Sequence, residues 1–356
     1  MGSVIGSFLN VVIYRMPLGL NISKPKSRCP VCQTPIQTRD NLPILGWLLL
    51  RGKCRTCQAP ISVRYPIVEA LTGLFFLFLY ILLVHSGGQF LPYRTPNRFW
   101  GSYQILEGRT WDLIALDVYY SYLFIVLLAS AYIQFDGQLI PRRLLIWCFA
   151  IGITAGVLIP ELHPVPALIS TRAEVSNTEA LLNELYYYGT LHVGITVETL
   201  KTLVWGLLYG AITGVLFCWP GFFRQQSASL FPQRTSWLLI LAGVYLGWQQ
   251  TVTLGFLAAC GLFCLNLSSG GNRQFLLRLP ASAFIVAILT LQLLFGKYLT
   301  ILPYHMSYLS YLLVTGFQII AIPVLTGVSQ SIYLKRIMQT KTQDQISIDE
   351  SRSITF

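Results

Sequence analysis

The chain has 356 residues, of which 54% are hydrophobic and only 11% are charged. So few charges cannot cover the surface of a water-soluble globule of this length, which excludes that class and indicates a membrane protein in contact with lipid. The formal net charge of +11 would suit a nucleic-acid partner, but we expect none, because the basic residues gather in loops between apolar segments.

Nine apolar segments follow one another and predict an all-α fold, a polytopic membrane helix bundle of about eight or nine transmembrane helices. They are Gly2–Met16, Pro66–His85, Leu113–Ala131, Leu144–Ile159, Leu203–Phe223, Trp237–Trp248, Val252–Leu267, Ala281–Phe295 and Tyr308–Leu334. Several are shorter than the roughly 20 residues that cross about 30 Å of hydrocarbon, so some helices are expected to be half-spans.

These segments divide the chain into four predicted parts. A first membrane helix (1–16) precedes a loop domain (17–65), the main helix bundle (66–334) follows, and a polar tail (335–356) ends the chain. The bundle contains an insertion at 160–202, where the spacing of apolar residues predicts an amphipathic helix on the membrane surface.

The charges predict which side of the membrane each loop occupies. Nine of the 25 basic residues lie between Arg15 and Arg64, whereas the connections 86–112 and 160–202 hold half of the 14 acidic residues. Loops rich in Lys and Arg stay in the cytoplasm. We therefore expect the loop domain and the carboxyl tail to be cytoplasmic.

Four cysteines in the loop domain form two Cys-x-x-Cys pairs. Cys29 and Cys32 make the first pair, Cys54 and Cys57 make the second, and 21 residues lie between the pairs. This spacing is typical of a zinc ribbon with four thiolate ligands. A reducing cytoplasm disfavours disulfides, although redox-active pairs and cysteines without a ligand remain alternatives. Four protein ligands leave no open position on the metal, so this Zn²⁺ would be structural.

Five short runs in the first 73 residues carry a family resemblance. They are GSFLNVVIYRMP (6–17), SRCPVC (27–32), DNLPILGW (40–47), RGKCRTC (51–57) and ISVRYPIVEALTG (61–73). They resemble the amino-terminal domain of bacterial prepilin peptidases, which are intramembrane aspartic peptidases. The resemblance implies a protein of the bacterial inner membrane that acts on prepilins or pseudopilins of type IV pilus and type II secretion systems. Such enzymes remove the leader and often methylate the new amino terminus, with S-adenosylmethionine as cofactor.

The second half departs from the pattern of that family at both catalytic aspartates. The resemblance puts the first at Gln134, in AYIQFDGQLIPRRL (131–144), and the second at Thr235, shortly before LILAGVYLGW (239–248). Between Glu198 and Asp344 the chain has no Asp or Glu. An aspartic peptidase needs two carboxylates, one that takes a proton from water and one kept protonated. A glutamine can orient water but cannot take its proton.

Three functions remain open at this point. The chain is a proteolytically inactive relative that binds prepilins or assists assembly, or an active peptidase that uses Asp136 with a displaced acid such as Glu69, or a methyltransferase only. Asp136 is better explained as a solvated turn residue beside Gly137, paired with Arg142 or Arg143. Glu69 is better explained as a residue that holds the loop domain against the helices.

Overall fold

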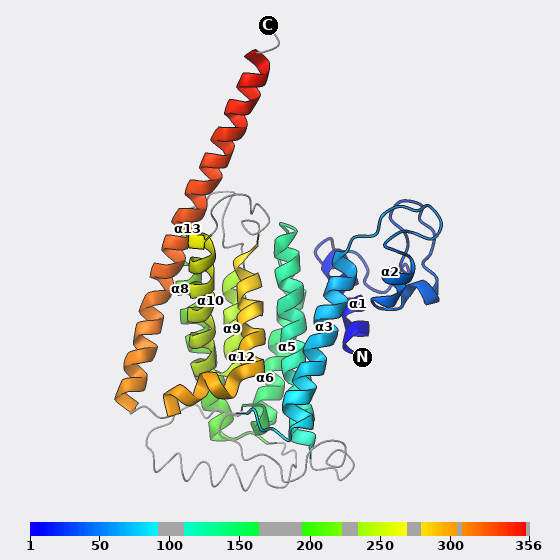
Figure 1. Cartoon of the computed structure of the whole chain (residues 1–356). Coiled ribbons are helices and arrows are strands. Elements are labelled where there is room, and N and C mark those ends of the chain that lie inside the picture. Colours follow the sequence, from blue (N-terminus) through cyan, green and yellow to red (C-terminus); the bar gives the residue numbers. More distant parts are fainter. Residues whose placement is uncertain (92–109, 164–193, 223–233, 269–278, 305–307, 354–356) are drawn as a thin grey trace.

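A computed structural model of the chain describes residues 1–91, 110–163, 194–222, 234–268, 279–304 and 308–353. The described residues are mostly helical, and they contain two isolated β-bridges but no extended strand. The all-α prediction is therefore confirmed (Figure 1). The amphipathic helix predicted within 160–202 lies outside the described residues.

The helices match the predicted apolar segments, except that α13 continues through most of the predicted polar tail. They are α1 (Gly2–Arg15), α2 (Leu45–Leu49), α3 (Arg64–Tyr80, continued by the π-helical turn η2, Ile81–His85), α5 (Trp111–Phe135), α6 (Arg142–Leu158), α8 (Val197–Phe222), α9 (Thr235–Leu246), α10 (Trp248–Ser268), α12 (Ala281–Tyr304) and α13 (Tyr308–Ser353). Two short 3₁₀ turns, η1 (Thr38–Asn41) and η3 (Pro160–Leu162), complete the described elements. Each predicted segment has a helix; α2 is the helix that the hydrophobic pattern did not predict.

Five stretches of the described helices are long and apolar enough to cross a membrane. They are Arg64–His85, Trp111–Phe135, Thr199–Trp219, Trp248–Leu267 and Leu313–Lys335. Two shorter apolar helices, Thr235–Leu246 and Ala281–Phe295, match the expected half-spans. Together these helices support a multi-pass membrane protein.

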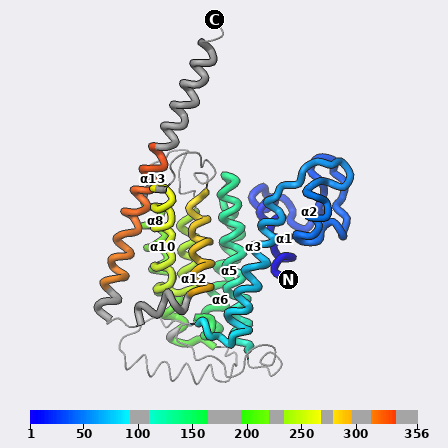
Figure 2. Tube along the Cα trace, in the orientation of Figure 1, coloured from blue at the N-terminus to red at the C-terminus, as the bar shows by residue number. Residues whose placement is uncertain are grey.

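Helix α5 is the centre of the bundle. It packs against α1 and α3 on one side and against α6, α9 and α12 on the other, and Figure 2 shows α8, α10 and α13 beyond them. Its side chains Leu113, Leu116, Leu123 and Leu127 are fully buried. The loop domain lies beside α1 and α3, at the opposite edge of the bundle from α13 (Figure 2).

Two helix pairs approach so closely that only glycine fits between them. In α8 and α9, a Cβ on Gly206 would lie 2.1 Å from the carbonyl oxygen of Gly243, and a Cβ on Gly243 would lie 2.1 Å from that of Gly206. In α1 and α3, a Cβ on Gly6 would lie 2.8 Å from the Cα of Glu69. Small residues of this kind let membrane helices pack backbone to backbone, and these two contacts fix the positions of α9 and of the loop domain.

Candidate functional site

The four loop cysteines converge on one point. Their Sγ atoms all lie within 4.8 Å of one another, and the closest pairs are Cys29 with Cys57 at 3.7 Å and Cys32 with Cys54 at 3.9 Å. A tetrahedral zinc site with Zn–S bonds of about 2.3 Å separates its sulfurs by about 3.8 Å, whereas a disulfide requires about 2.05 Å. The arrangement therefore fits a zinc ion shared by both pairs, and all four cysteines are free thiols.

The two Cys-x-x-Cys turns are structural repeats of each other. Both have the sequence Cys-x-x-Cys-Gln-x-Pro-Ile, beginning at Cys29 and at Cys54. The amide of each first cysteine donates to a carbonyl five residues later, at 3.0 and 2.8 Å. The glutamines, Gln33 and Gln58, have positive φ angles of 57° and 58°. The glutamine that follows each Cys-x-x-Cys pair is a further sequence signal of the repeat, which the cysteine spacing alone did not reveal.

Hydrogen bonds prepare part of this site for metal. The hydroxyl and backbone of Thr34 lower the pKa of Cys32 to about 6, and the backbone amides of Cys57 and Thr56 lower the pKa of Cys54. The amide of Ala59 favours the Cys57 thiolate, but burial and the neighbouring thiols raise the pKa of Cys57 to about 11. Thiolates are the form that binds zinc, so metal binding must displace the remaining protons.

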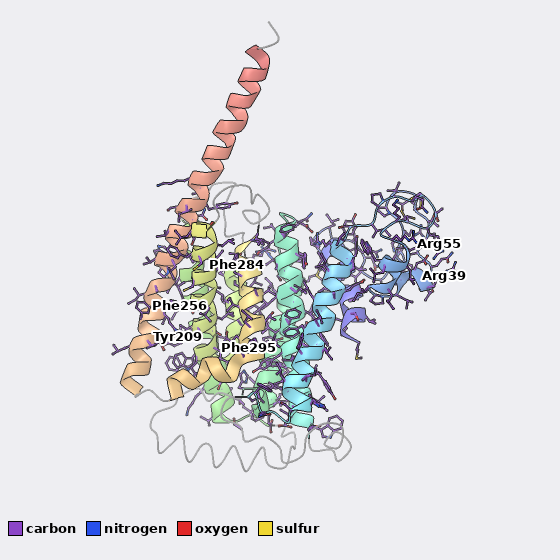
Figure 3. The ribbon with its side chains drawn as sticks, viewed as in Figure 1. Arg39, Arg55, Tyr209, Phe256, Phe284 and Phe295 are labelled. Atoms are coloured by element: carbon purple, nitrogen blue, oxygen red, sulfur yellow. The ribbon has the colours of Figure 1, made fainter. Side chains whose placement is uncertain are left out.

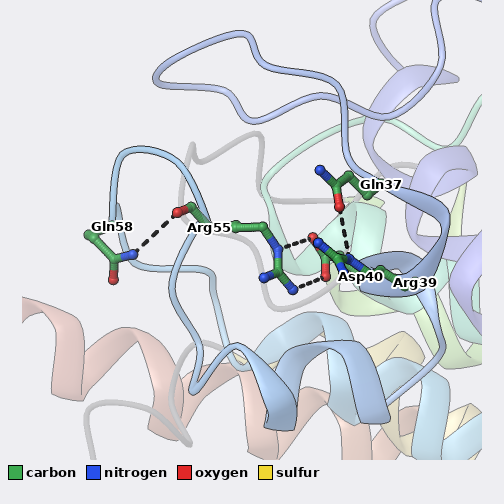
Figure 4. A network of polar contacts seen from close by, with 5 residues as sticks. All are labelled: Gln37, Arg39, Asp40, Arg55 and Gln58. Carbon is green, nitrogen blue, oxygen red and sulfur yellow. Dashed lines mark hydrogen bonds and ion pairs between the residues drawn. The ribbon is translucent and has the colours of Figure 1, made fainter.

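An ion pair joins the 3₁₀ turn η1 to the second cysteine turn. Arg55 donates from Nε and Nη2 to the carboxylate of Asp40 at 2.8 and 2.6 Å (Figure 4). The guanidinium lowers the pKa of Asp40. In the same view, Arg39 donates to the side chain of Gln37 at 2.9 Å, and Gln58 donates to the Arg55 carbonyl at 3.4 Å. These contacts hold the loop domain together on the side away from the membrane helices.

Three hydrogen bonds lie where the loop domain meets α1 and α3: one joins the loop to α3, one lies within the loop, and one joins α1 to α3. The amide of Ile44 donates to Oε2 of Glu69 at 2.7 Å, Trp47 Nε1 donates to the Ile61 carbonyl at 3.0 Å, and the side-chain amide of Asn10 donates to the Tyr65 carbonyl at 3.2 Å. Glu69 is buried. The structure thus gives Glu69 the predicted role of holding the loop against the helices.

The second candidate site lies where α5 ends and α9 begins. Gln134, in the last turn of α5, donates from Nε2 to the hydroxyl oxygen of Thr235, the first residue of α9, at 3.1 Å. Gln134 is 5% exposed and Thr235 is fully buried. Arg234 immediately precedes α9 with a left-handed backbone, and its guanidinium donates to the carbonyl of Ile140. Two neutral side chains therefore meet here, 101 residues apart in sequence.

Asp136 lies two residues beyond Gln134 and contacts a residue that the sequence did not suggest. Its two carboxylate oxygens accept from Nη1 of Arg64 at 2.6 and 2.7 Å, so the expected pairing with Arg142 or Arg143 is wrong. The Arg64 guanidinium also lies 4.8 Å above the Tyr132 ring. The sequence did not predict this long-range pairing, because nothing distinguished Arg64 from the many other basic residues near the membrane.

The proposed couple between Asp136 and Glu69 has no support in this geometry. The carboxylate of Asp136 hydrogen-bonds to Arg64, whereas that of Glu69 hydrogen-bonds to the amide of Ile44. Each carboxylate thus has a structural contact of its own. The first contact joins the start of α3 to the end of α5, and the second joins the loop domain to α3, so both are packing contacts.

Comparisons with known proteins agree with the amino-terminal resemblance. Residues 1–83 match the family model of the bacterial peptidase A24 N-terminal domain. The chain is 46% identical over 104 residues to a type 4 prepilin-like proteins leader peptide-processing enzyme of Escherichia coli (24% of this chain, 39% of the relative). It is 57% identical over 76 residues to a prepilin leader peptidase/N-methyltransferase of Myxococcus xanthus (21% of this chain, 23% of the relative).

A longer match covers two fifths of the chain. A prepilin leader peptidase/N-methyltransferase of Aeromonas hydrophila is 36% identical over 171 residues, which cover 40% of this chain and 49% of the relative. The chain thus spans less than half the length of these curated relatives. No solved structure is significantly similar to it.

Proposed function

We propose that this chain is a member of the bacterial prepilin peptidase family. On this premise, it binds prepilin-type or pseudopilin helices as an assembly factor and does not cut them. We place it in the bacterial inner membrane, with the loop domain and carboxyl tail in the cytoplasm, because nine of its 25 basic residues lie between Arg15 and Arg64. We assign the four loop cysteines to a structural Zn²⁺.

One observation carries the proposal of inactivity, namely the hydrogen bond between Gln134 and Thr235. If these residues stand at the two aspartate positions of the family, the site has no group that ionises near neutral pH. An amide and a hydroxyl can hold a water molecule, but neither can remove its proton or act as the paired acid. Without both steps, peptide hydrolysis by the aspartic mechanism stops.

The nearest carboxylate in sequence does not restore the chemistry in this proposal. Asp136 is bound to Arg64 through both oxygens, so its carboxylate already has a partner. An aspartic mechanism also needs a second, protonated carboxyl group, and the chain has no acidic residue from 199 to 343, so α9, α10 and α12 cannot supply one. Asp136 therefore serves as the partner of Arg64.

Binding does not need these carboxylates. An apolar prepilin helix would pack on the membrane helices through van der Waals contacts and small residues, and neither depends on ionised groups. A protein that has lost the catalytic acids can therefore keep its substrate surface, and this separation of binding from cleavage is what the experiment must measure.

The test is a leader-cleavage assay with the purified full chain, a prepilin and an active relative as positive control. We expect no processed pilin from the wild type or from Asp136→Asn, while unprocessed prepilin co-purifies with both. Cleavage by the wild type that Asp136→Asn abolishes would establish the active alternative. Cleavage that persists in Asp136→Asn would show that the chain is active but does not use Asp136. Failure of prepilin to co-purify would disprove the binding role.

Methyl transfer is a second candidate, because the match to the family model lies in residues 1–83, away from Gln134 and Thr235. If this activity is present, the chain should transfer labelled methyl from S-adenosylmethionine to an already processed pilin. We expect a variant with Cys54→Ser to lose the transfer, because the cysteine turns hold the loop domain together. Absence of labelled pilin with wild-type protein that retains its zinc would exclude this activity.

A further inference from the structure

The short helix α2 leaves an apolar face uncovered. Leu45, Leu48 and Leu49 are 57%, 56% and 75% exposed, and Leu42 just before the helix is 49% exposed. Four large apolar side chains within eight residues form a patch of the kind that contacts a partner or a membrane. Gly46, on the other face, packs so closely on the Asp40 carbonyl that a Cβ would lie 2.2 Å from its oxygen. This contact fixes which face of α2 packs on the loop, so the leucines cannot turn inward.

The attachment of α2 to α3 places this patch at the depth of the membrane interface. Ile44, which caps α2, donates its amide to Glu69 at 2.7 Å, and Glu69 is five residues inside the candidate span that begins at Arg64. At a rise of 1.5 Å per residue, that is about 7 Å below the start of the span. Figure 1 shows α2 beside α1 and α3, at the level of their loop-domain ends.

A tryptophan lies among the leucines, and basic residues flank α2 in the sequence. Trp47 is half-buried and its Nε1 is bonded to the Ile61 carbonyl, just outside the span, a position typical of interfacial tryptophans. Arg39, Arg51 and Lys53 are all exposed, and Figure 3 shows Arg39 and Arg55 on the outer edge of the loop domain. A leucine patch with a basic border is the pattern of a surface that binds anionic lipid.

We propose that Leu42 and α2 insert into the adjacent leaflet of the bilayer, where Arg39, Arg51 and Lys53 bind anionic phospholipid headgroups. The leucines enter the boundary between headgroups and acyl chains, and the cysteine turns stay in water. This second point of membrane contact fixes the angle between the loop domain and the helix bundle. A second copy of the chain or a protein partner on the same patch is the competing occupant that the experiment must separate.

The experiment uses the full chain in lipid nanodiscs with a photo-crosslinking residue in place of Leu49. The matched control carries the same residue in place of Thr56, which is also exposed but lies in the second cysteine turn. We expect lipid adducts at position 49 and at least tenfold fewer at position 56. Adding phosphatidylglycerol to phosphatidylcholine nanodiscs should raise the adduct yield at position 49 several-fold, and high salt should remove that increase.

A second variant tests the basic border without touching the leucines. Arg51→Gln with Lys53→Gln should lose the dependence on phosphatidylglycerol while lipid adducts at position 49 remain. Adducts from position 49 to another protein chain, or equal lipid labelling at positions 49 and 56, would overturn the proposal. An unchanged phosphatidylglycerol dependence in the double variant would equally overturn the role of the basic residues.

Discussion

Replacing Gly206 with alanine should destabilise the helix bundle by about 3 kcal/mol, at the upper end of the usual cost of overpacking. The new methyl group would lie 2.1 Å from the carbonyl oxygen of Gly243 and 2.9 Å from its carbonyl carbon. Backbone atoms cannot rotate away as a side chain can, so α8 and α9 must separate. We expect a clear fall in the thermal unfolding midpoint of the purified protein in detergent.

The matched control is Gly316→Ala in α13, where an added Cβ meets no atom within 4 Å. Alanine favours a helix over glycine by about 1 kcal/mol, so this variant should be neutral or slightly stabilised. Gly243→Ala should resemble Gly206→Ala, and the double variant should lose less than the sum, because the helices have already moved apart. Equal midpoints for Gly206→Ala and Gly316→Ala would contradict the close packing of α8 and α9.

The same contact positions the candidate site. Thr235 is the first residue of α9, and its bond to Gln134 spans the gap between α9 and α5. The neutral pair is also easier to bury than the acids it would replace, because two facing carboxylates repel each other and lose their hydration. On the proposal that Gln134 and Thr235 stand at the two aspartate positions, their neutral side chains avoid this energetic cost.

The helices and the cysteine cluster could be predicted because each depends on local pattern. An apolar run of suitable length predicts a helix, and the two Cys-x-x-Cys pairs predict a shared metal site. Contacts between distant residues could not be predicted in the same way. Arg64 and Asp136 are 72 residues apart, and one sequence does not show which of its many basic residues approaches a given carboxylate.

Helix α2 was missed for a different reason. It has only five residues, Leu45–Leu49, too few to show the 3.6-residue periodicity by which helices are predicted. Its position depends on the bond from Ile44 to Glu69, 25 residues later. The resemblance did identify the run from Asp40 to Trp47, so a local signal was present, but its structural meaning required the contact with α3.

Replacing Cys54 with serine should abolish stoichiometric zinc binding and loosen the loop domain. Structural zinc sites contribute about 10–16 kcal/mol of apparent binding free energy, so the loss of one of four thiolates should weaken binding by more than 100-fold. The other supports of the loop include the Asp40–Arg55 ion pair and the bonds of Ile44 and Trp47. Metal analysis of protein made under reducing conditions measures the zinc, and trypsin cleavage at Arg51 and Arg55 measures the loosening.

Cys264→Ser is the matched control, because Cys264 is an exposed thiol in α10, outside the cluster. It should keep one zinc per chain and the trypsin resistance of the wild type. Chelation of the wild type should reproduce the Cys54→Ser pattern, and added zinc should reverse it, since the fold of the loop depends on the metal and not on the cysteine itself. Absence of zinc from the wild-type protein would contradict a structural zinc site that organises the loop beside Glu69 and α2. A Cys54→Ser loop that resists trypsin as well as the wild type does would contradict it equally.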